Sequence, residues 1–162
     1  MSEYAIEMRG ITKTFPGVVA NDNVTLQVRP REIHALLGEN GAGKSTLMSI
    51  LFGSYSADSG QIFLDGEEVF IKNPNVATAL GIGMVHQHFK LVQNYTVTEN
   101  IVLGMEPTKG RLLDLKSARA KVAELSEQYG LSVDPDALIE EITVGQQQRV
   151  EILKTLFRNA NI

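Results

Sequence analysis

A run of glycines followed by a lysine and a hydroxyl residue carries the clearest chemistry in this 162-residue sequence. Gly38, Gly43, Lys44 and Ser45 fit the phosphate-loop pattern G-x-x-x-x-G-K-[ST] without a mismatch. Glycines let the backbone curl so that successive N–H groups point inward, and a following helix adds the positive end of its dipole. We therefore expect Lys44 to reach the β- and γ-phosphates of a nucleotide, and the Ser45 hydroxyl to ligate Mg²⁺.

The segments on either side of this loop are those that a phosphate loop needs. Residues 33–37 predict a short buried strand, and residues 46–52 predict an amphipathic helix that begins beside the loop. A glycine-rich turn with an incidental lysine is the alternative, and the order strand, loop, helix argues against it. The loop residues are all candidates for nucleotide binding: Gly38, Glu39, Asn40, Gly41, Ala42, Gly43, Lys44, Ser45 and Thr46.

Composition limits the class of protein. With 43% hydrophobic and 21% charged residues, the chain has the make-up of one globular domain with a core. A formal net charge of -4 argues against nucleic acid as a partner, and the absence of cysteine excludes disulfides and thiolate metal sites. We expect no signal peptide and no membrane span, so that any membrane role would come through a partner.

Alternating residues predict an antiparallel sheet in the first part of the chain. Residues 4–9 and 23–28 are the candidate strands, residues 12–17 form a loop between them, and residues 61–70 predict a hairpin with an Asp-Gly turn. Phe15 therefore falls at the edge of a loop. Its ring can stack on a purine base or act as a small packing anchor, and both interpretations stay open at this point.

A glutamine follows the second candidate strand of the core. Residues 74–80 predict a short helix, and residues 82–85 predict a buried strand that leads into Gln87. Ligands gather at the carboxyl ends of strands in α/β sheets, so we expect the Gln87 amide to hold Mg²⁺ or an attacking water. His86 and His88 flank it, but two histidines without a third ligand do not make a metal site.

Helices dominate the second half of the sequence. Thr96 and Glu99 predict a capping box, and apolar residues at intervals of three and four predict a long helix over residues 115–129. Residues 134–135, an Asp-Pro pair, predict the start of another helix. Residues 142–149 lead into a last helix with apolar residues at helical spacing.

Three separated motifs together resemble those of ABC-transporter ATPases. Residues 38–45 resemble the Walker A motif, Gln87 the Q-loop, and residues 143–146 the signature motif. This resemblance implies an α/β fold, with a P-loop NTPase (RecA-like) core, an N-terminal antiparallel β subdomain and an α-helical subdomain. The implied division is a nucleotide-binding core, a helical subdomain and a signature helix that returns to the core: residues 1–88, 89–144 and 145–162.

The chain is similar, more specifically, to the ATPase subunits of importers for simple sugars and nucleosides. Residues 15–18, 38–45 and 144–151 carry this likeness, and residues 86–92 look more like the nucleoside branch than the ribose branch. The likeness implies that Phe15 stacks on adenine. It also implies a peripheral subunit at the cytoplasmic face of the cell membrane.

The resemblance implies a mechanism in which two cassettes close head to tail around two molecules of ATP with Mg²⁺. Lys44 and Gln87 would carry the catalytic roles, and Ser45 and Gln87 the metal roles. The implied partners are a second cassette, transmembrane permease subunits and, indirectly, an extracytoplasmic solute-binding protein. Four signature residues would contact the γ-phosphate held by the other cassette: Thr143, Val144, Gly145 and Gln146.

Two departures from the family pattern matter. Ile142 and Thr143 stand where the signature usually has Leu-Ser, which we expect to weaken closure without abolishing it. No apolar run in the sequence ends in Asp-Glu. The resemblance implies that this pair supplies the general base and the acidic residue that holds Mg²⁺ through water. We interpret the fold as incomplete at its C-terminus, before the Walker B strand, and expect weak ATP binding with almost no hydrolysis.

Two other functions are compatible with a phosphate loop. A nucleotide kinase would need a lid of arginines, and the candidate arginines form no cluster in the sequence: Arg111, Arg119, Arg149 and Arg158. An ATP-dependent dimerisation or regulatory module without turnover is the second alternative. It would behave almost like an incomplete transporter ATPase.

Overall fold

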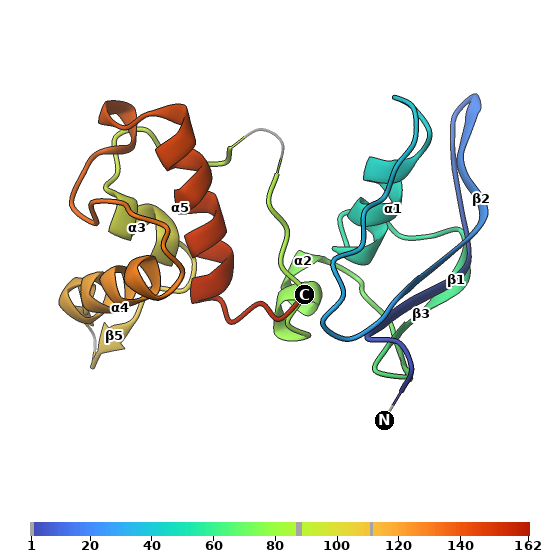
Figure 1. Cartoon of the computed structure of the whole chain (residues 1–162), viewed down its shortest axis with the longest axis horizontal. Coiled ribbons are helices and arrows are strands. Elements are labelled where there is room, and N and C mark those ends of the chain that lie inside the picture. The colour runs from blue at the N-terminus through green and yellow to red at the C-terminus, as the bar shows by residue number, and fades with distance from the viewer. Residues whose placement is uncertain (1, 87–88, 111) are drawn as a thin grey trace. The chain divides into compact units, whose positions relative to one another are not determined.

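The computed structural model describes residues 2–86, 89–110 and 112–162. The chain divides into two compact units, Met1–Leu80 (unit 1) and Gly81–Ile162 (unit 2). Unit 1 is built around a sheet, whereas unit 2 is mainly helical (Figure 1). The three-part division inferred from the sequence stays a prediction.

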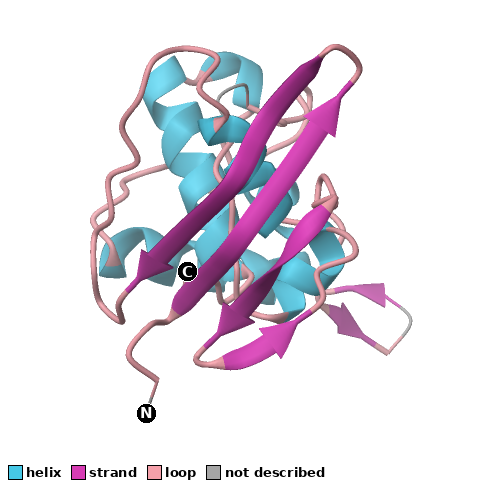
Figure 2. Cartoon of the chain, turned by 90° about the vertical axis from the view of Figure 1, so that its right-hand side faces the viewer, coloured by secondary structure: helices cyan, strands magenta, loops and turns pink. Residues whose placement is uncertain are grey.

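The sheet of unit 1 is antiparallel, with the strand order β2-β1-β3-β4 (Figure 2). In β1, one of the two inner strands, Ile6 pairs with Val28 of β2 on one side and with Leu64 of β3 on the other. Met8 and Ile11, also on β1, are completely buried. The predicted antiparallel strands and the Asp-Gly hairpin are confirmed. The strands are β1 (Ile6–Phe15), β2 (Val18–Val28), β3 (Ser59–Leu64) and β4 (Glu67–Val69).

Two short helices complete unit 1, as the sequence predicts. Helix α1 (Lys44–Leu51) buries Leu47, Ile50 and Leu51, whose spacing of three and four residues forms one apolar face. Helix α2 (Pro74–Ala79) begins after Asn73, whose side chain accepts a hydrogen bond from the N–H of Val76 at 3.1 Å.

Two predictions for unit 1 are wrong. Residues 12–15 are not a loop but the end of β1, so Phe15 is a strand residue next to a two-residue turn. Residues 33–37, all of which the structure describes, do not form a buried strand: Ile33 is 100% exposed and Leu37 is 89% exposed. A strand needs a hydrogen-bonded neighbour, and no other described segment pairs with these residues.

Unit 2 packs its helices around one apolar core. The core joins α3, α4 and α5 through residues such as Ile101, Val122 and Leu153, all completely buried. The predicted capping box of Thr96 and Glu99 is present. The elements are α3 (Val97–Val102), β5 (Thr108–Lys109), β6 (Leu112–Leu113), α4 (Leu115–Gln128), the 3-10 helix η1 (Ile139–Glu141) and α5 (Val144–Phe157).

Two further predictions, both for unit 2, are wrong. Residues 82–85 do not form a strand, although Ile82 is buried and the Gly83 N–H donates to the Ile162 carbonyl at 2.7 Å. Pro135 does not begin an α-helix, because its carbonyl accepts hydrogen bonds from the N–H and hydroxyl of Thr98. Within the described ranges, every helix falls short of the length and apolar character of a membrane-spanning segment.

Candidate functional site

The phosphate loop leads directly into α1, and its glycines set its path. Gly41 and Gly43 have φ values of 87° and 83°, in the left-handed region that favours glycine. Gly43 is also tightly packed, because a Cβ at this position would collide with the carbonyl oxygen of Ala20 on β2. The loop therefore needs glycine at residue 43 both for its conformation and for its contact with the sheet.

The side chain of Lys44 turns back over the loop. Its Nζ donates hydrogen bonds to the carbonyl oxygens of Gly38 and Glu39, each at 2.7 Å. These acceptors are neutral, whereas hydrogen bonds between an ammonium and a phosphate oxygen are charge-assisted and stronger. The ammonium is thus placed at the loop, where an incoming phosphate can replace the carbonyl groups.

The first turn of α1 has free donor capacity. Its N-cap residue is Gly43, and no side chain of the described residues caps the helix. The first internal bond runs from the N–H of Leu47 to the Gly43 carbonyl, which leaves the N–H groups of residues 44–46 for an outside acceptor. Because no acidic residue lies in this turn, no carboxylate there opposes the attraction between an anion and the positive end of the helix dipole.

The residues present fit a magnesium–nucleotide complex better than a bare metal ion. Ser45 is exposed in the first turn of α1, where its hydroxyl is available as a ligand. Among the described residues, no group of three or more His, Cys, Asp or Glu side chains is arranged to hold a metal ion. Mg²⁺ commonly takes one or two protein ligands and draws the others from phosphates and water.

Asn21, on the neighbouring strand β2, supports the phosphate loop. The sequence patterns did not predict this role. The Asn21 Nδ2 donates to the Gly43 carbonyl at 3.3 Å, and the residue is only 4% exposed. Its Oδ1 is buried without a hydrogen-bond partner. No local pattern marks Asn21, because its contact spans 22 residues of sequence.

Phe15 takes part in a small aromatic contact in unit 1. Its ring meets that of Tyr55 edge to face, with centroids 5.3 Å apart and an interplanar angle of 74°. On the same strand, the Nζ of Lys13 lies 5.6 Å from the centroid of the Phe15 ring. The contact with Tyr55 supports the interpretation that Phe15 is a packing anchor. Because the ring is only half-buried, its stacking on a base stays a prediction.

An ion pair fixes the strand that carries Phe15. Lys13 Nζ donates to Asp58 Oδ1 at 2.7 Å, and Asp58 Oδ2 accepts from the N–H of Thr14 at the same distance. Two hydrogen bonds hold the pKa of the Asp58 carboxyl below its usual value: the bond from Lys13 has the larger effect and the bond from Thr14 the smaller. Asp58 thereby fastens the loop after α1 to β1, and sequence patterns gave no sign of it.

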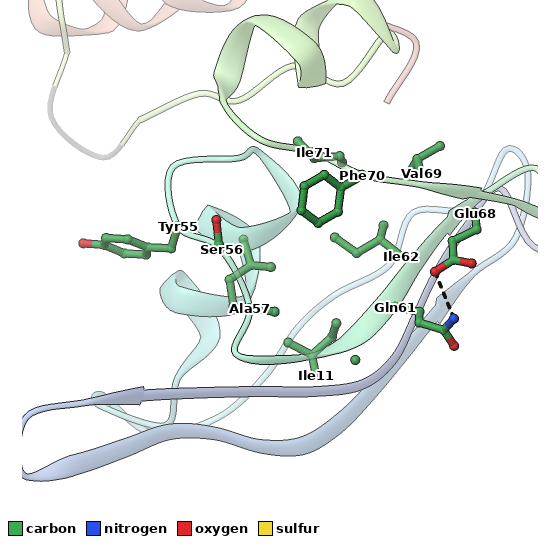
Figure 3. Close-up of a pocket in the computed structure, with 12 residues that line it drawn as sticks. Ile11, Tyr55, Ser56, Ala57, Gln61, Ile62, Glu68, Val69, Phe70 and Ile71 are labelled. Carbon is green, nitrogen blue, oxygen red and sulfur yellow. Dashed lines mark hydrogen bonds between the residues drawn. The ribbon is translucent and has the colours of Figure 1, made fainter.

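Unit 1 also contains a cavity of about 120 Å³, shown in Figure 3. Tyr55, Phe70 and Ile71 are among its lining residues, and a hydrogen bond of 2.9 Å joins Gln61 to Glu68 beside it. Small-molecule sites usually have about 300 Å³ or more. This cavity is therefore too small for a nucleotide and does not compete with the phosphate loop.

The signature residues begin α5 in unit 2. The Thr143 Oγ1 accepts from the N–H of Gln146 at 3.3 Å, and Gln146 Oε1 accepts from the N–H of Thr143 at 2.9 Å. Val144 is 70% exposed, and a Cβ placed on Gly145 would meet open space. The capping box engages the N–H groups of Thr143 and Gln146, whereas Val144 and Gly145 between them are exposed and accessible to another molecule.

The structure gathers the loop residues 38–46 at the start of α1 and the signature residues at the start of α5. Gln87, the candidate for both a catalytic and a metal role, lies outside the described residues, as does His88. His86 is described, and burial, then the charge of Lys90, lowers its pKa. The roles of all these residues stay predictions.

The fold and these motifs define a class of protein. The family model described as ABC transporter matches residues 21–162, so the chain belongs to the ABC transporter family, in the part that forms the ATP-binding cassette. In structure, it is similar to a nucleotide-free ATP-binding cassette from an ABC transporter, with a TM-score of 0.83 and 26% identity over 97% of this chain and 66% of that one. The cassette fold with an antiparallel β subdomain, predicted from the sequence, is confirmed.

Three ATP-binding proteins of import systems are similar to this chain over almost its whole length. The chain is 59% identical to the guanosine import ATP-binding protein NupO of Bacillus subtilis, and 61% to the nucleoside import ATP-binding protein NupA of Lactococcus lactis. It is 46% identical to the galactose/methyl galactoside import ATP-binding protein MglA of Escherichia coli. Each alignment covers 99% of this chain but only 31% or 32% of the relative, so the chain spans about a third of their length.

Proposed function

We propose that this chain is the nucleotide-binding part of an ABC importer that takes up a nucleoside or a simple sugar. One observation carries the proposal: the start of α1 offers uncapped N–H groups and the Lys44 ammonium at the same loop. A triphosphate matches both, because it accepts hydrogen bonds from the backbone and is attracted by the lysine.

The loop residues take distinct parts in this proposal. The backbone of residues 38–46 cradles the phosphates, Lys44 stabilises charge on the β- and γ-phosphates, and Phe15 stacks on adenine. The Ser45 hydroxyl and the Gln87 amide hold Mg²⁺, which supplies charge neutralisation at the phosphates when bound. Gln87 also orients the attacking water.

The signature turn acts on a second molecule in this proposal. Thr143, Val144, Gly145 and Gln146 cover the nucleotide of a partner cassette, and the exposure of Val144 and Gly145 supports that role. The other partners are transmembrane permease subunits and, through them, an extracytoplasmic solute-binding protein. This arrangement places the chain as a peripheral subunit at the cytoplasmic face of the membrane.

A nucleoside is the favoured solute. The two relatives named for guanosine or nucleoside import are 59% and 61% identical to this chain, against 51% for one named for carbohydrate transport and 47% or less for those named for galactose, xylose or glucose import. Residues 86–92 support the same choice in the sequence.

These 162 residues are proposed to bind ATP and hydrolyse it slowly, because their sequence holds no Asp-Glu strand end to supply a general base. Sedimentation with MgATP and release of phosphate test the two halves of this statement. We expect ATP-dependent association, lost in Lys44→Ala, with little phosphate release. Rapid release that Lys44→Ala abolishes would contradict slow turnover, and association that ignores both ATP and Lys44 would contradict the nucleotide role.

A further inference from the structure

Unit 2 contains a buried carboxylate that the proposed chemistry does not use. Glu151 lies on α5, two turns after the signature residues, and is only 3% exposed. A buried carboxylate is costly unless charged or polar groups satisfy it. The Glu151 Oε1 accepts a hydrogen bond from the backbone N–H of Lys90 at 2.8 Å.

The position of that backbone donor is informative. Lys90 is three residues after Gln87, so Glu151 joins the helix that starts with the signature to the stretch that follows the glutamine. The contact spans 61 residues of sequence. A carboxylate bond to an N–H group is charge-assisted and stronger than a bond between neutral groups.

A second buried polar residue holds the same stretch to another helix. Asn100 of α3 is completely buried, and its Oδ1 accepts from the Val92 N–H at 2.7 Å. Its Nδ2 donates to the carbonyl groups of Val92 and Thr96, each at 3.0 Å. Residues 90–92 are therefore fastened at two points, by Glu151 to α5 and by Asn100 to α3.

Two basic side chains lie close enough to Glu151 to interact with it electrostatically. Burial lowers the pKa of Lys154, and the charge of Glu151 opposes that effect. Glu151 also opposes the lowering of the pKa of His86 by burial and by Lys90. Glu151 thus interacts with Lys154 on α5 and with His86, besides accepting the hydrogen bond from the Lys90 N–H.

We propose that Glu151 is a positioning residue that makes the stretch after Gln87 move with α5, so that a change at the glutamine reaches the signature turn. The inference rests on the proposed nucleotide function, because Gln87 must respond to a bound nucleotide. Glu151 itself touches no reacting atom. Asn100 serves as the fixed second point, and the bond to Lys90 is the polar contact with α5.

Amide exchange and amide chemical shifts of the complete 162-residue chain test this role. The variants are Glu151→Met, which removes the acceptor, and Glu151→Gln, which retains a neutral one, with Glu124→Met on the exposed side of α4 as the control. In Glu151→Met we expect exchange of the Lys90 N–H to rise about tenfold or more, because a charge-assisted bond is lost. Exchange at Val92 should stay unchanged, and Glu151→Gln should restore part of the protection at Lys90.

Addition of MgATP gives the readout that a purely structural role would not move. In the unsubstituted chain and in Glu124→Met, at protein concentrations below those of the MgATP-dependent association, we expect shifts both at residues 41–46 and at residues 143–147. In Glu151→Met the shifts at 143–147 should disappear while those at 41–46 remain, and Glu151→Gln should recover them in part.

Each other outcome contradicts a specific statement. Unchanged exchange at Lys90, or shifts at residues 143–147 that persist in Glu151→Met, would overturn the positioning role alone. The same follows if residues 41–46 respond to MgATP in the unsubstituted chain while residues 143–147 do not. No response at residues 41–46 would overturn the proposed nucleotide function, and the positioning role with it. Should Glu151→Met not fold, the comparison of Glu151→Gln with the unsubstituted chain decides, since weakened shifts at 143–147 are still required.

Discussion

The two helices that begin at candidate site residues start in opposite ways. Helix α5 satisfies its own first turn, because Thr143 and Gln146 form a complete capping box. Helix α1 begins at Gly43 in a left-handed conformation, and no described side chain caps it. Helix α1 therefore leaves its donors for an anion, whereas α5 caps its own start and leaves Val144 and Gly145 exposed.

The support behind each helix start differs as well. Gly43 is pressed against β2, where Ala20 and the Asn21 side chain contact it. Gly145 has open space around its Cα hydrogen position. The α1 start is therefore a rigid, sheet-backed site for a ligand, and the α5 start is an open surface that suits contact with a second molecule.

Of the substitutions that test this difference between the two helix starts, the one that places a Cβ between α1 and β2 should have the largest effect. Gly43→Ala combines strain at positive φ with a collision against the Ala20 carbonyl, so we expect it to lower the free energy of unfolding of unit 1 by about 3–4 kcal/mol. Gly41→Ala is the matched control, with a similar φ and open space, and should cost only about 1 kcal/mol. Urea unfolding curves of both variants measure the difference, and equal costs would show that the contact with β2 is unimportant.

Removing the ammonium at α1 should have the next largest effect. Lys44→Ala is expected to weaken MgATP binding about 100-fold, because charge-assisted bonds to the phosphates are lost. Titration with a fluorescent ATP analogue measures the affinity, and Lys109→Ala, on the exposed strand β5, is the control. An affinity of Lys44→Ala within a factor of three of the unsubstituted chain would place the phosphates elsewhere.

The capping box of α5 should contribute a moderate amount. Thr143→Ala removes the hydroxyl that accepts from the Gln146 N–H, so we expect stability to fall by about 1 kcal/mol. Thr143→Ser keeps the hydroxyl and should change stability by only a few tenths of a kcal/mol. Thermal unfolding compares the two variants. If both lower the melting temperature equally, the lost methyl group rather than the cap is responsible.

The smallest effect concerns pH. Lys13 lowers the pKa of Asp58 in the folded chain, so this carboxylate stabilises unit 1 above its unfolded pKa and loses that contribution as the pH falls through its folded pKa. Asp58→Asn should reduce stability slightly at pH 7 and make no difference well below about pH 4. Urea midpoints at the two pH values measure this. The cap of α5 holds no titratable group, so Thr143→Ala should lower stability equally at both pH values. A pH-dependent effect of Thr143→Ala would contradict this difference between Asp58 and the α5 cap.

Local signals were enough to predict the parts of the fold that local contacts build. The capping box of Thr96 and Glu99, the helix over Leu115–Gln128 and the glycine loop before α1 all follow from residues a few positions apart. The same holds for the family resemblance, since each motif is a short stretch.

Predictions failed where distant contacts decide the outcome. Residues 33–37 have the apolar character of a buried strand but lack a pairing strand among the described residues. Residues 134–135 resemble a helix start, yet no α-helix begins there, and the N–H and hydroxyl of Thr98 donate hydrogen bonds to the Pro135 carbonyl. Asn21, Asp58 and Glu151 support the candidate site through contacts spanning 22, 44 and 61 residues, which no local pattern reveals.

Isothermal titration calorimetry of the 162-residue chain with MgATP and, in parallel, with AMP and magnesium tests the central claim most directly. If the start of α1 binds the β- and γ-phosphates, MgATP should bind at one saturable site and AMP, which lacks both groups, should bind far more weakly. Equal affinity for the two nucleotides, or no binding of MgATP at millimolar concentration, would contradict the claim.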